Sequence, residues 1–304
     1  MISGNPSSDR PFAGMLLMVV GIASFACMDA IVKWLTGIYP LLQVIAMRSW
    51  CGFPFLLLIV HLHGGFSRLE TRRPGVHLLR FLFVLGLTSF FFWGLSKMKL
   101  ADAVALTFVA PILVAILSVP LLGESVGRHR WTAILAGFAG ILVMLRPGSS
   151  LFQWASVVVL LSALCYALLM VSTRRLKSTE NTEALMFWPA TGVAVTGLFI
   201  APIQWVTPAA VDLLLFVAAG MFGSFGIVCL THAFRLAQAA LVSPFEYTAL
   251  IWATLLGYLL WGDLPDRHTL LGASIVIASG LYILYRETLR NAEAKAGAAR
   301  HRSG

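Results

Sequence analysis

Charged residues are scarce in this chain, and their scarcity excludes an ordinary soluble protein. Only 12% of its 304 residues are Asp, Glu, Lys or Arg, and the mean hydropathy is +0.87, whereas a soluble globular domain carries roughly a quarter charged residues. The polar segments between the apolar runs are short, so they leave no room for a separate soluble catalytic domain. The composition therefore indicates an integral membrane protein surrounded by the lipid bilayer.

Cysteine pairs and the motifs of common enzymes are also lacking. The chain contains no H-E-x-x-H, G-x-S-x-G or G-x-x-x-x-G-K-[ST] motif, which removes the usual metalloprotease, serine hydrolase and ATP-driven chemistries. The four cysteines lie in apolar runs without a metal-ligand spacing such as C-x-x-C, so we interpret them as packing residues: Cys27, Cys51, Cys165 and Cys229. We therefore expect no enzyme activity, no cofactor and no metal site.

Other classes of membrane protein stay open at this stage. A passive channel and a non-transporting scaffold share the same hydropathy, so composition does not exclude them. A membrane-embedded enzyme is a weaker alternative, for which Asp263 and Asp266 in the segment GDLPD are the nearest approach to metal ligands. Because Arg267 follows directly, a polar cluster at a helix end is the simpler interpretation of this segment.

Long apolar runs recur along almost the whole chain. Each run of about 20 residues can cross ~30 Å of hydrocarbon as an α-helix. We therefore predict an all-α integral membrane protein with ten transmembrane helices. The predicted spans cover residues 12–34, 38–61, 76–96, 101–122, 131–146, 153–173, 184–204, 210–234, 239–261 and 269–285.

The net charge of +9 is explained by topology rather than by a nucleic-acid partner. With the N-terminus inside the cell, fifteen of the 22 Lys and Arg residues lie on the cytoplasmic face and five on the opposite face, while Arg48 and Arg80 lie inside or at the lip of spans. Lys and Arg accumulate in cytoplasmic loops. We predict a multi-pass protein of the cell (inner) membrane with both termini in the cytoplasm.

A turn motif occurs twice and indicates an internal repeat. LLGESVGRHRW at residues 121–131 recurs as LWGDLPDRHTL at 260–270, at an offset of 139 residues. Each copy joins the fourth and fifth predicted helices of one half, and an odd number of spans per half turns the second copy upside down. We predict an inverted 5+5 repeat of residues 12–146 and 153–286, followed by a basic cytoplasmic tail at 287–304.

Two five-helix halves, each with a Gly-acid turn before its last helix, resemble the drug/metabolite transporter superfamily in its EamA-type ten-helix branch. The resemblance covers residues 12–286. Within it, the segments 72–95 and 101–124 are similar to a subgroup described as carriers of riboflavin, S-adenosylmethionine and other organic metabolites. The resemblance implies secondary, non-ATP transport of a small organic metabolite around a midplane cavity. It leaves open the substrate, the direction, the oligomeric state, and whether a proton or another ion is coupled.

The first candidate site residue is Glu246, in the apolar stretch SPFEYTALIW. A carboxylate at membrane depth is costly unless it is paired, hydrated or protonated, so we expect Glu246 to face a cavity. Ala249, Ala253 and Gly257 share its helical face and leave space there, and Pro244 removes a backbone donor nearby. The alternatives are a structural ion pair and a shallow carboxylate wetted from the cytoplasm.

Two further candidate site residues, Arg48 and Asp29, are charged and lie within the first two predicted spans. Arg48 lies about ten residues into its span, near the midplane. It could bind a substrate carboxylate or phosphate, or it could clamp helices together through Asp29 or Glu246. Asp29 and Lys33 are four residues apart, and we expect them to form a solvated ion pair at the outer lip, with a coupling site at Asp29 as the alternative.

Four aromatic residues complete the set of candidate site residues. Trp50 and Trp252 lie in the middle of predicted spans, and Tyr166 and Tyr247 lie beside the deep region. Aromatic rings there could stack on a planar or cationic substrate. Ordinary aromatic packing between helices is the more common role and stays open as the alternative.

Overall fold

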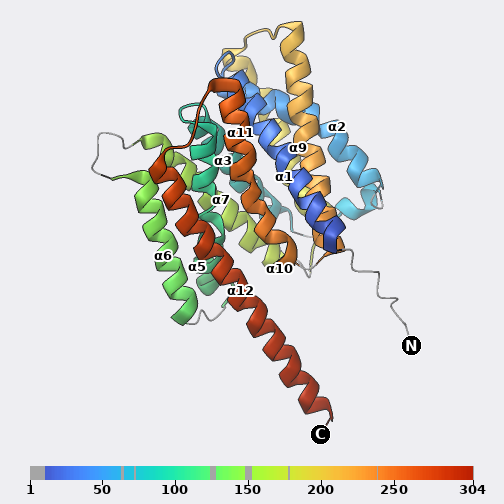
Figure 1. Ribbon diagram of the computed structural model, residues 1–304. Helices are drawn as coiled ribbons and strands as arrows, with labels where there is room; N and C mark the ends of the chain where they lie inside the picture. The colour runs from blue at the N-terminus through green and yellow to red at the C-terminus, as the bar shows by residue number, and fades with distance from the viewer. Residues whose placement is uncertain are drawn as a thin grey trace.

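The computed structural model describes residues 11–62, 65–71, 73–123, 128–147, 153–176, 179–237 and 239–303, and no strand occurs among them. In these ranges, eight helices are long and apolar enough to cross a membrane, and Trp131–Leu145 is a shorter apolar helix. The predicted all-α membrane architecture is confirmed. The order of the elements along the chain follows the ten predicted spans (Figure 1).

Among the described residues, each half of the chain builds six α-helices. In the first half these are α1 (Pro11–Thr36), α2 (Leu41–Leu62), α3 (Pro74–Leu95), α4 (Leu100–Thr107), α5 (Ala110–Leu122) and α6 (Arg128–Leu145). In the second half they are α7 (Trp154–Leu176), α8 (Thr182–Ile200), α9 (Ala210–Leu236), α10 (Ala239–Val242), α11 (Ala249–Trp261) and α12 (Arg267–Ser303). Three short 3₁₀ segments lie between them: η1 (Phe66–Leu69), η2 (Ala201–Gln204) and η3 (Ser243–Thr248).

Two of the predicted spans are broken helices. The fourth span consists of α4 and α5, and the ninth, expected as one helix over 239–261, consists of α10, η3 and α11. Pro111 lies in the first turn of α5 and Pro244 in the first turn of η3. Proline lacks a backbone N–H and is tolerated best in a first turn, where that donor has no partner in any case. The break in the fourth span is therefore followed by Pro111, and the break in the ninth span contains Pro244.

The offset of the repeated turn motif extends to whole helices. The starts of α4, α5 and α6 precede those of α10, α11 and α12 by the same 139 residues. At that offset Gly123 and Gly262 end α5 and α11 with φ values of 69° and 68°, a left-handed conformation that glycine adopts without steric cost. Equivalent residues thus end equivalent helices in the two halves.

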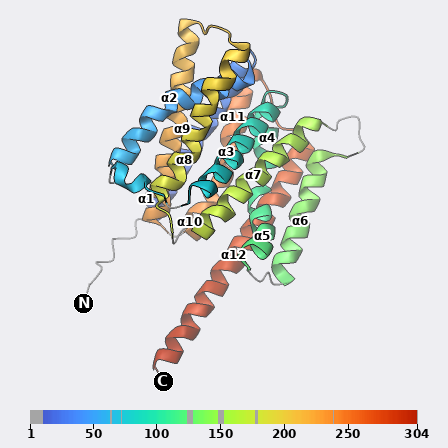
Figure 2. The same ribbon diagram turned by 180° about the vertical axis from the view of Figure 1, so that it is seen from behind.

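The contacts between helices also repeat when each helix is replaced by its equivalent in the other half. α1 packs on α9 as α7 packs on α3, and α2 contacts α9 as α8 contacts α3. The equivalent helices α6 and α12 pack on each other and lie side by side in the views of Figures 1 and 2. At this contact a Cβ added to Gly140 would press on the backbone carbonyl of Gly272, and a Cβ added to Gly272 would press on that of Gly140. At the offset of 139, Ser279 corresponds to Gly140 and Ala133 to Gly272, and the Ser279 hydroxyl donates to the carbonyl of Ala133. The two halves therefore interlock as an inverted repeat.

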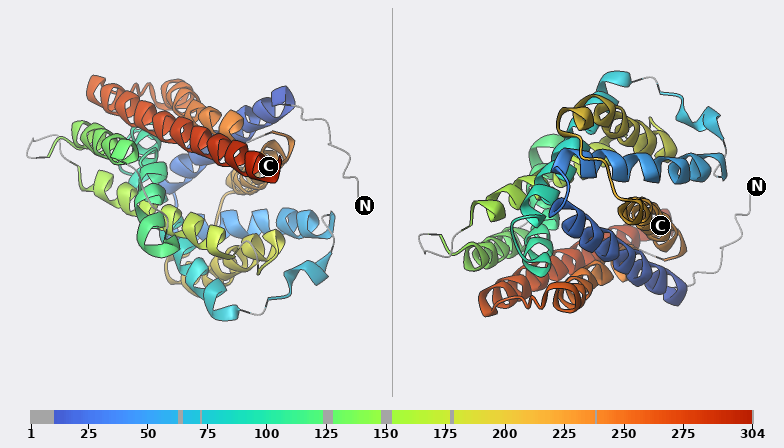
Figure 3. Two further views of the ribbon diagram at one scale, coloured as in Figure 1. Left: turned by 90° about the horizontal axis from the view of Figure 1, so that it is seen from below. Right: turned by 90° about the horizontal axis from the view of Figure 1, so that it is seen from above.

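The bundle has two ends that are useful to distinguish. α1 begins and α12 ends on one side of the bundle, at the bottom of Figure 1; we call it the termini side and the opposite end the far side. Figure 3 views the bundle from these two ends. The main core of buried apolar residues draws on both halves, including Leu35, Leu95 and Leu100 from the first and Val159 and Phe216 from the second.

At the far side, Asp266 caps the start of α12. Its Oδ1 accepts the backbone N–H groups of His268 and Thr269, both at 2.9 Å, and its Oδ2 pairs with the guanidinium of Arg146. Partial burial raises the pKa of Asp266, but the N–H of Thr269, the guanidinium of Arg146 and the N–H of His268 outweigh it, so the net shift is below the ordinary 3.8. The interpretation of GDLPD as a helix-end polar cluster agrees with this geometry.

Asp266→Asn should make the thermal stability of the protein less dependent on acidity. Because the pKa is lowered by folding, the stabilisation by the carboxylate is complete above the ordinary value and is lost as the pH falls below it. Asn keeps the cap, so Asp266→Asn should cost at most about 1 kcal/mol, whereas Asp266→Ala should cost about 1 kcal/mol more. The test is to measure the unfolding temperature of the purified protein between pH 7 and pH 3. If the unfolding temperature of Asp266→Asn falls as steeply with decreasing pH as that of the unmodified chain, the prediction is wrong.

Candidate functional site

A large cavity lies between the two halves, lined by residues that the structure describes. Its volume is about 650 Å³, within the range of about 300–1,000 Å³ common for small-molecule sites. Residues of α1, α2, α3, α4, α5 and α7, of η3, and of α11 and α12 line it. Apolar side chains make up most of the wall, and the charged side chains in it are Asp29, Arg48, Arg174 and Glu246.

The cavity runs along the bundle toward the termini side. On α7 its lining extends from Ser162 to Arg174, which corresponds to about 18 Å at 1.5 Å per residue. Arg174 lies in the last turn of α7, and α7 ends near the start of α3, where His77 contacts Glu180. The long axis of the cavity therefore leads from the deep residues to the end of the bundle at which α1 begins.

Asp29 and Arg48 lie together at the deep end of the cavity. Their side chains interact electrostatically, Arg48 Nη1 lies 3.4 Å from Met28 Sδ, and the guanidinium carbon lies 5.3 Å from the centre of the Phe92 ring. Asp29 is 9% exposed. Within the described residues Asp29 Oδ1 and Arg48 Nε have no hydrogen-bond partner. A buried acid and base thus face the cavity with unused hydrogen-bonding capacity.

The expected outer ion pair between Asp29 and Lys33 is wrong. Lys33 Nζ instead donates to the backbone carbonyls of Leu95, at 3.1 Å, and Met98, at 2.6 Å, and lies 5.4 Å from the centre of the Trp261 ring. Leu95 is the last residue of α3, and its carbonyl is free to accept such a bond because a helix leaves its last carbonyls without an internal partner. Met98 lies in the turn between α3 and α4. Asp29 therefore interacts with Arg48 instead and borders the cavity.

Three cations of the first half hold one turn of the second half at the far side. Lys33 lies over Trp261, Lys99 Nζ donates to the carbonyl of Leu264 at 3.0 Å, and Arg146 pairs with Asp266. The rings of Trp34 and Trp261 lie 6.4 Å apart in the same region. These contacts join the two halves at the end of the bundle opposite the cavity entrance.

Glu246 lies in η3, where the broken ninth span meets the cavity. It acts electrostatically on the phenols of Tyr166 and Tyr247, which also line the cavity. In the described part of the chain it has no hydrogen bond or ion pair. At the offset of 139, Thr107 and Phe108 occupy the equivalent positions at the break in the fourth span, and both also line the cavity. The acid is therefore present in only one of two equivalent sites.

The two acids lie at different depths. α1 and α11 run in the same direction and their far ends meet at Trp34 and Trp261. Asp29 precedes Trp34 by five residues, whereas Glu246 precedes Trp261 by fifteen. At 1.5 Å per residue the carboxylates differ by about 15 Å along the bundle. An elongated ligand would reach both levels, and a small one would reach one at a time.

The two tryptophans among the candidates lie outside the cavity lining. The indole N–H of Trp50 donates to the carbonyl of Ala194 at 2.8 Å, so Trp50 joins α2 to α8. Trp252 packs on the small core cluster that includes Met18 and Ala233, between α1 and α9. The structure therefore places both residues in helix packing, whereas Tyr166 and Tyr247 remain in the cavity wall.

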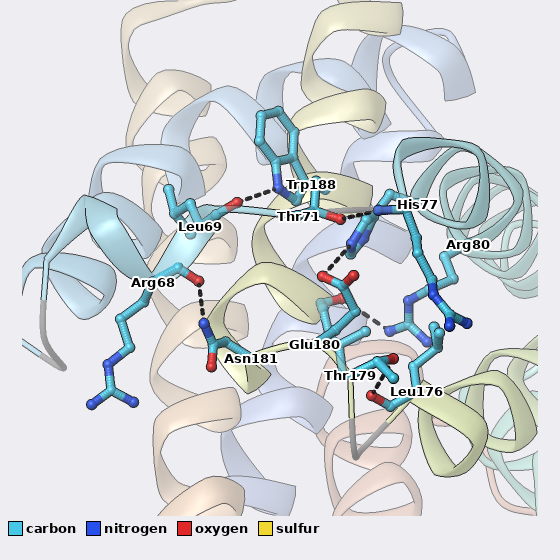
Figure 4. A network of polar contacts seen from close by, with 12 residues as sticks. Arg68, Leu69, Thr71, His77, Arg80, Leu176, Thr179, Glu180, Asn181 and Trp188 are labelled. Carbon is cyan, nitrogen blue, oxygen red and sulfur yellow. Dashed lines mark hydrogen bonds and ion pairs between the residues drawn. The ribbon is translucent and has the colours of Figure 1, made fainter.

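A polar network beside the cavity entrance was not expected from sequence. Arg80, 4% exposed, donates to the carbonyls of Leu169 and Leu185 and to the hydroxyls of Ser172 and Thr173, at 2.6–3.2 Å. One turn earlier on α3, His77 Nε2 lies 3.3 Å from Glu180 Oε2 (Figure 4). These contacts tie α3 to α7 and α8. The buried cation supports the wall that carries Thr173.

Comparisons with known proteins bear on what this cavity does. Residues 12–146 and 153–285 each match the EamA-like transporter family. An S-adenosylmethionine uptake transporter of Rickettsia prowazekii is 29% identical over 275 residues, or 90% of this chain and 93% of that protein. A riboflavin transporter of Rhizobium johnstonii is 31% identical over 291 residues, or 92% and 94%.

Two further comparisons cover a similar share of the chain. A pseudopaline exporter of Pseudomonas aeruginosa is 29% identical over 274 residues, or 88% of this chain and 94% of that protein. A protein crystal structure superposes with a TM-score of 0.62 at 21% identity, covering 89% of this chain and 96% of that one. The fold is thus shared over most of the chain.

Proposed function

The chain belongs to the EamA-like transporter family, and on that premise we propose that it is a secondary transporter working by alternating access. It is a multi-pass membrane transporter of small metabolites rather than an enzyme. Residues 12–146 and 153–286 would act as the two repeats, with 287–304 as a basic cytoplasmic tail. The observation that carries the proposal is the cavity between the halves, which has charged groups at two depths and close inter-half contacts at one end.

We place the protein in the cell (inner) membrane with both termini in the cytoplasm. The excess of Lys and Arg on that face supports this orientation. The cavity then faces the cytoplasm, and the contacts of Lys33, Lys99 and Arg146 with the turn before α12 close the outer face. Alternating access requires these contacts to break when the cavity opens outward. Import and export can share this architecture, since the gradients set the direction.

The chemistry of the wall favours an organic substrate with both polar and aromatic parts. Arg48 suits a carboxylate or phosphate, Glu246 and the two tyrosines suit a cationic group, and Phe91 and Phe108 offer flat surfaces. S-adenosylmethionine, riboflavin and amino-acid-like compounds are the leading candidates. The names of the relatives support the same choice. A proton taken up by Glu246 is the simplest coupling ion for this site.

Purified protein should be stabilised against heat by one member of a panel containing S-adenosylmethionine, riboflavin and amino acids. A ligand that binds the folded form stabilises it by about 2.7 kcal/mol at 100 times its dissociation constant. In proteoliposomes the same compound should show saturable counterflow, because a carrier exchanges substrate across the membrane. Flux that rises linearly with concentration, without counterflow, would identify a passive channel instead.

A further inference from the structure

Tyr247 rests directly on a glycine of another helix. The space that a Cβ at Gly280 would occupy is filled by the Tyr247 hydroxyl, and both residues line the cavity. The Tyr247 ring also meets the Phe108 ring edge to face, with 5.0 Å between the ring centres. Among the described residues the hydroxyl has no hydrogen-bond partner. The position of the phenol is therefore set by packing, and Gly280 is one of the residues that it packs against.

The backbone of α12 gives no reason for a glycine at this position. Gly280 lies inside a long helix and has no positive φ value. Alanine is a far better helix former than glycine in a helix interior, because glycine gives up more conformational freedom. The contact with Tyr247 supplies the reason: only glycine lets the phenol lie against the helix backbone.

Tyr247 also lies between the entrance of the cavity and its deep end. Thr88 and Arg48 each lie seven residues from the far end of their helices, or about 10 Å at 1.5 Å per residue. Tyr247 lies fourteen residues before the far end of α11, so it is closer to the termini side than either of them. A molecule that enters from the termini side has to pass Tyr247 before it reaches the Asp29 and Arg48 pair.

We propose that Gly280 is a positioning residue, which lets the Tyr247 phenol lie against α12. It thereby sets the size of the largest substrate that reaches the deep end of the cavity. A side chain at position 280 pushes the phenol away from α12 and into the cavity that Tyr247 lines. The cavity narrows between its entrance and Arg48, and bulky molecules are excluded before small ones. The proposal rests on the proposed transport function for its physiological meaning, but the position of Tyr247 is testable without transport.

The first test measures access to the deep end by thiol labelling. In a chain whose four cysteines are replaced by alanine, Thr88→Cys supplies one thiol in the deep wall. N-ethylmaleimide is the small reagent and fluorescein-5-maleimide the bulky one. Gly280→Ala should lower the rate of the bulky reagent at least about fivefold relative to the small one. Adding Tyr247→Phe should restore the ratio, since the ring carbon Cζ left there would lie 3.2 Å from the new Cβ, a contact that a small shift relieves.

Gly137→Ala is the matched control for helix packing. A Cβ at Gly137 would press on the Ile112 side chain and lie 3.0 Å from Ser279 Oγ, between helices and outside the cavity lining. It should lower the unfolding temperature without changing the labelling ratio, and Tyr247→Phe should not correct it. If Gly280→Ala does not fold, Tyr247→Leu tests the same point in the opposite direction and should speed bulky labelling several-fold.

The second test measures uptake of radiolabelled S-adenosylmethionine and riboflavin into proteoliposomes. Gly280→Ala should raise the KM for the transported compound about tenfold, and Tyr247→Phe in that background should return it to within about twofold of the original. A labelling ratio unchanged by Gly280→Ala and Tyr247→Leu, or a defect that Tyr247→Phe leaves uncorrected, overturns the proposal. If the original protein takes up neither compound, the substrate assignment fails while the labelling result still decides the role of Gly280.

Discussion

Glu246→Gln is expected to lower saturable transport by about 10- to 100-fold. Glutamine has nearly the shape of glutamate but no charge, and a hydrogen bond to a charged group contributes about 1.5–3 kcal/mol, with a factor of ten for each 1.4 kcal/mol. Glu246 lines the cavity, and within the described residues it has no protein partner that would take up its charge. Its charge is therefore available to a substrate or to a proton.

Uptake into proteoliposomes over a range of pH separates these two roles of Glu246. If Glu246 carries the coupling proton, the remaining transport of Glu246→Gln should lose the pH dependence of the original protein. If Glu246 binds a cationic group of the substrate, KM should rise and the pH dependence should persist. Glu70→Gln, which removes an exposed carboxylate beside η1, is the matched control. Transport of Glu246→Gln equal to that of the control would end the functional assignment of Glu246.

The architecture was predictable because lipid imposes a simple rule on the chain. Backbone groups in the bilayer must be satisfied within the helix, so spans appear as long apolar runs, and the repeated turn motif revealed the offset that relates the helices of the two halves. The breaks in the fourth and ninth spans were less predictable. Pro111 and Pro244 indicated bends, but hydropathy alone does not show that a helix stops and restarts.

The candidate site was predictable as a set of anomalies but not as a set of contacts. Glu246, Arg48 and Asp29 stood out because polar groups in apolar runs are costly, and all three line the cavity. The partner of Asp29 was predicted wrongly. A spacing of four residues favours a pair between Asp29 and Lys33 only when no better acceptor lies near the Lys33 ammonium. The carbonyls of Leu95 and Met98, more than 60 residues away along the chain, are those acceptors.

Other errors have a similar physical origin. Trp50 lies mid-span, but depth within a span does not tell which face of a helix a side chain occupies, and its indole turned toward Ala194 on α8. Arg80 lies near the start of its helix, where a long cation commonly reaches toward water. Its acceptors come from α7 and α8, between 89 and 105 residues away along the chain. Only the tertiary fold brings them together.

Arg48→Met is expected to destabilise the protein by about 3 kcal/mol, and Asp29→Asn in the same chain is expected to recover most of that loss. Arg48 and Asp29 interact electrostatically, and removing one of two interacting buried charges leaves the other uncompensated. For a direct buried ion pair the cost is about 3–5 kcal/mol, and the lower value applies because both residues border the cavity. Unfolding temperatures of both single variants and the double variant give the coupling between the two residues. Purely additive effects would show that Arg48 and Asp29 do not form a pair.

Transport by the double variant Arg48→Met with Asp29→Asn then separates a structural clamp from a substrate contact. A clamp only has to hold helices together, so a double variant with restored stability should transport at close to the original rate. If the pair binds the polar group of the substrate, as the unpartnered Asp29 Oδ1 and Arg48 Nε favour, the folded double variant should remain at least about tenfold impaired, since a bond to a charged group contributes about 1.5–3 kcal/mol. The charge exchange Arg48→Glu with Glu246→Arg should not restore stability, because the two levels lie about 15 Å apart along the bundle and Arg48 interacts electrostatically with Asp29.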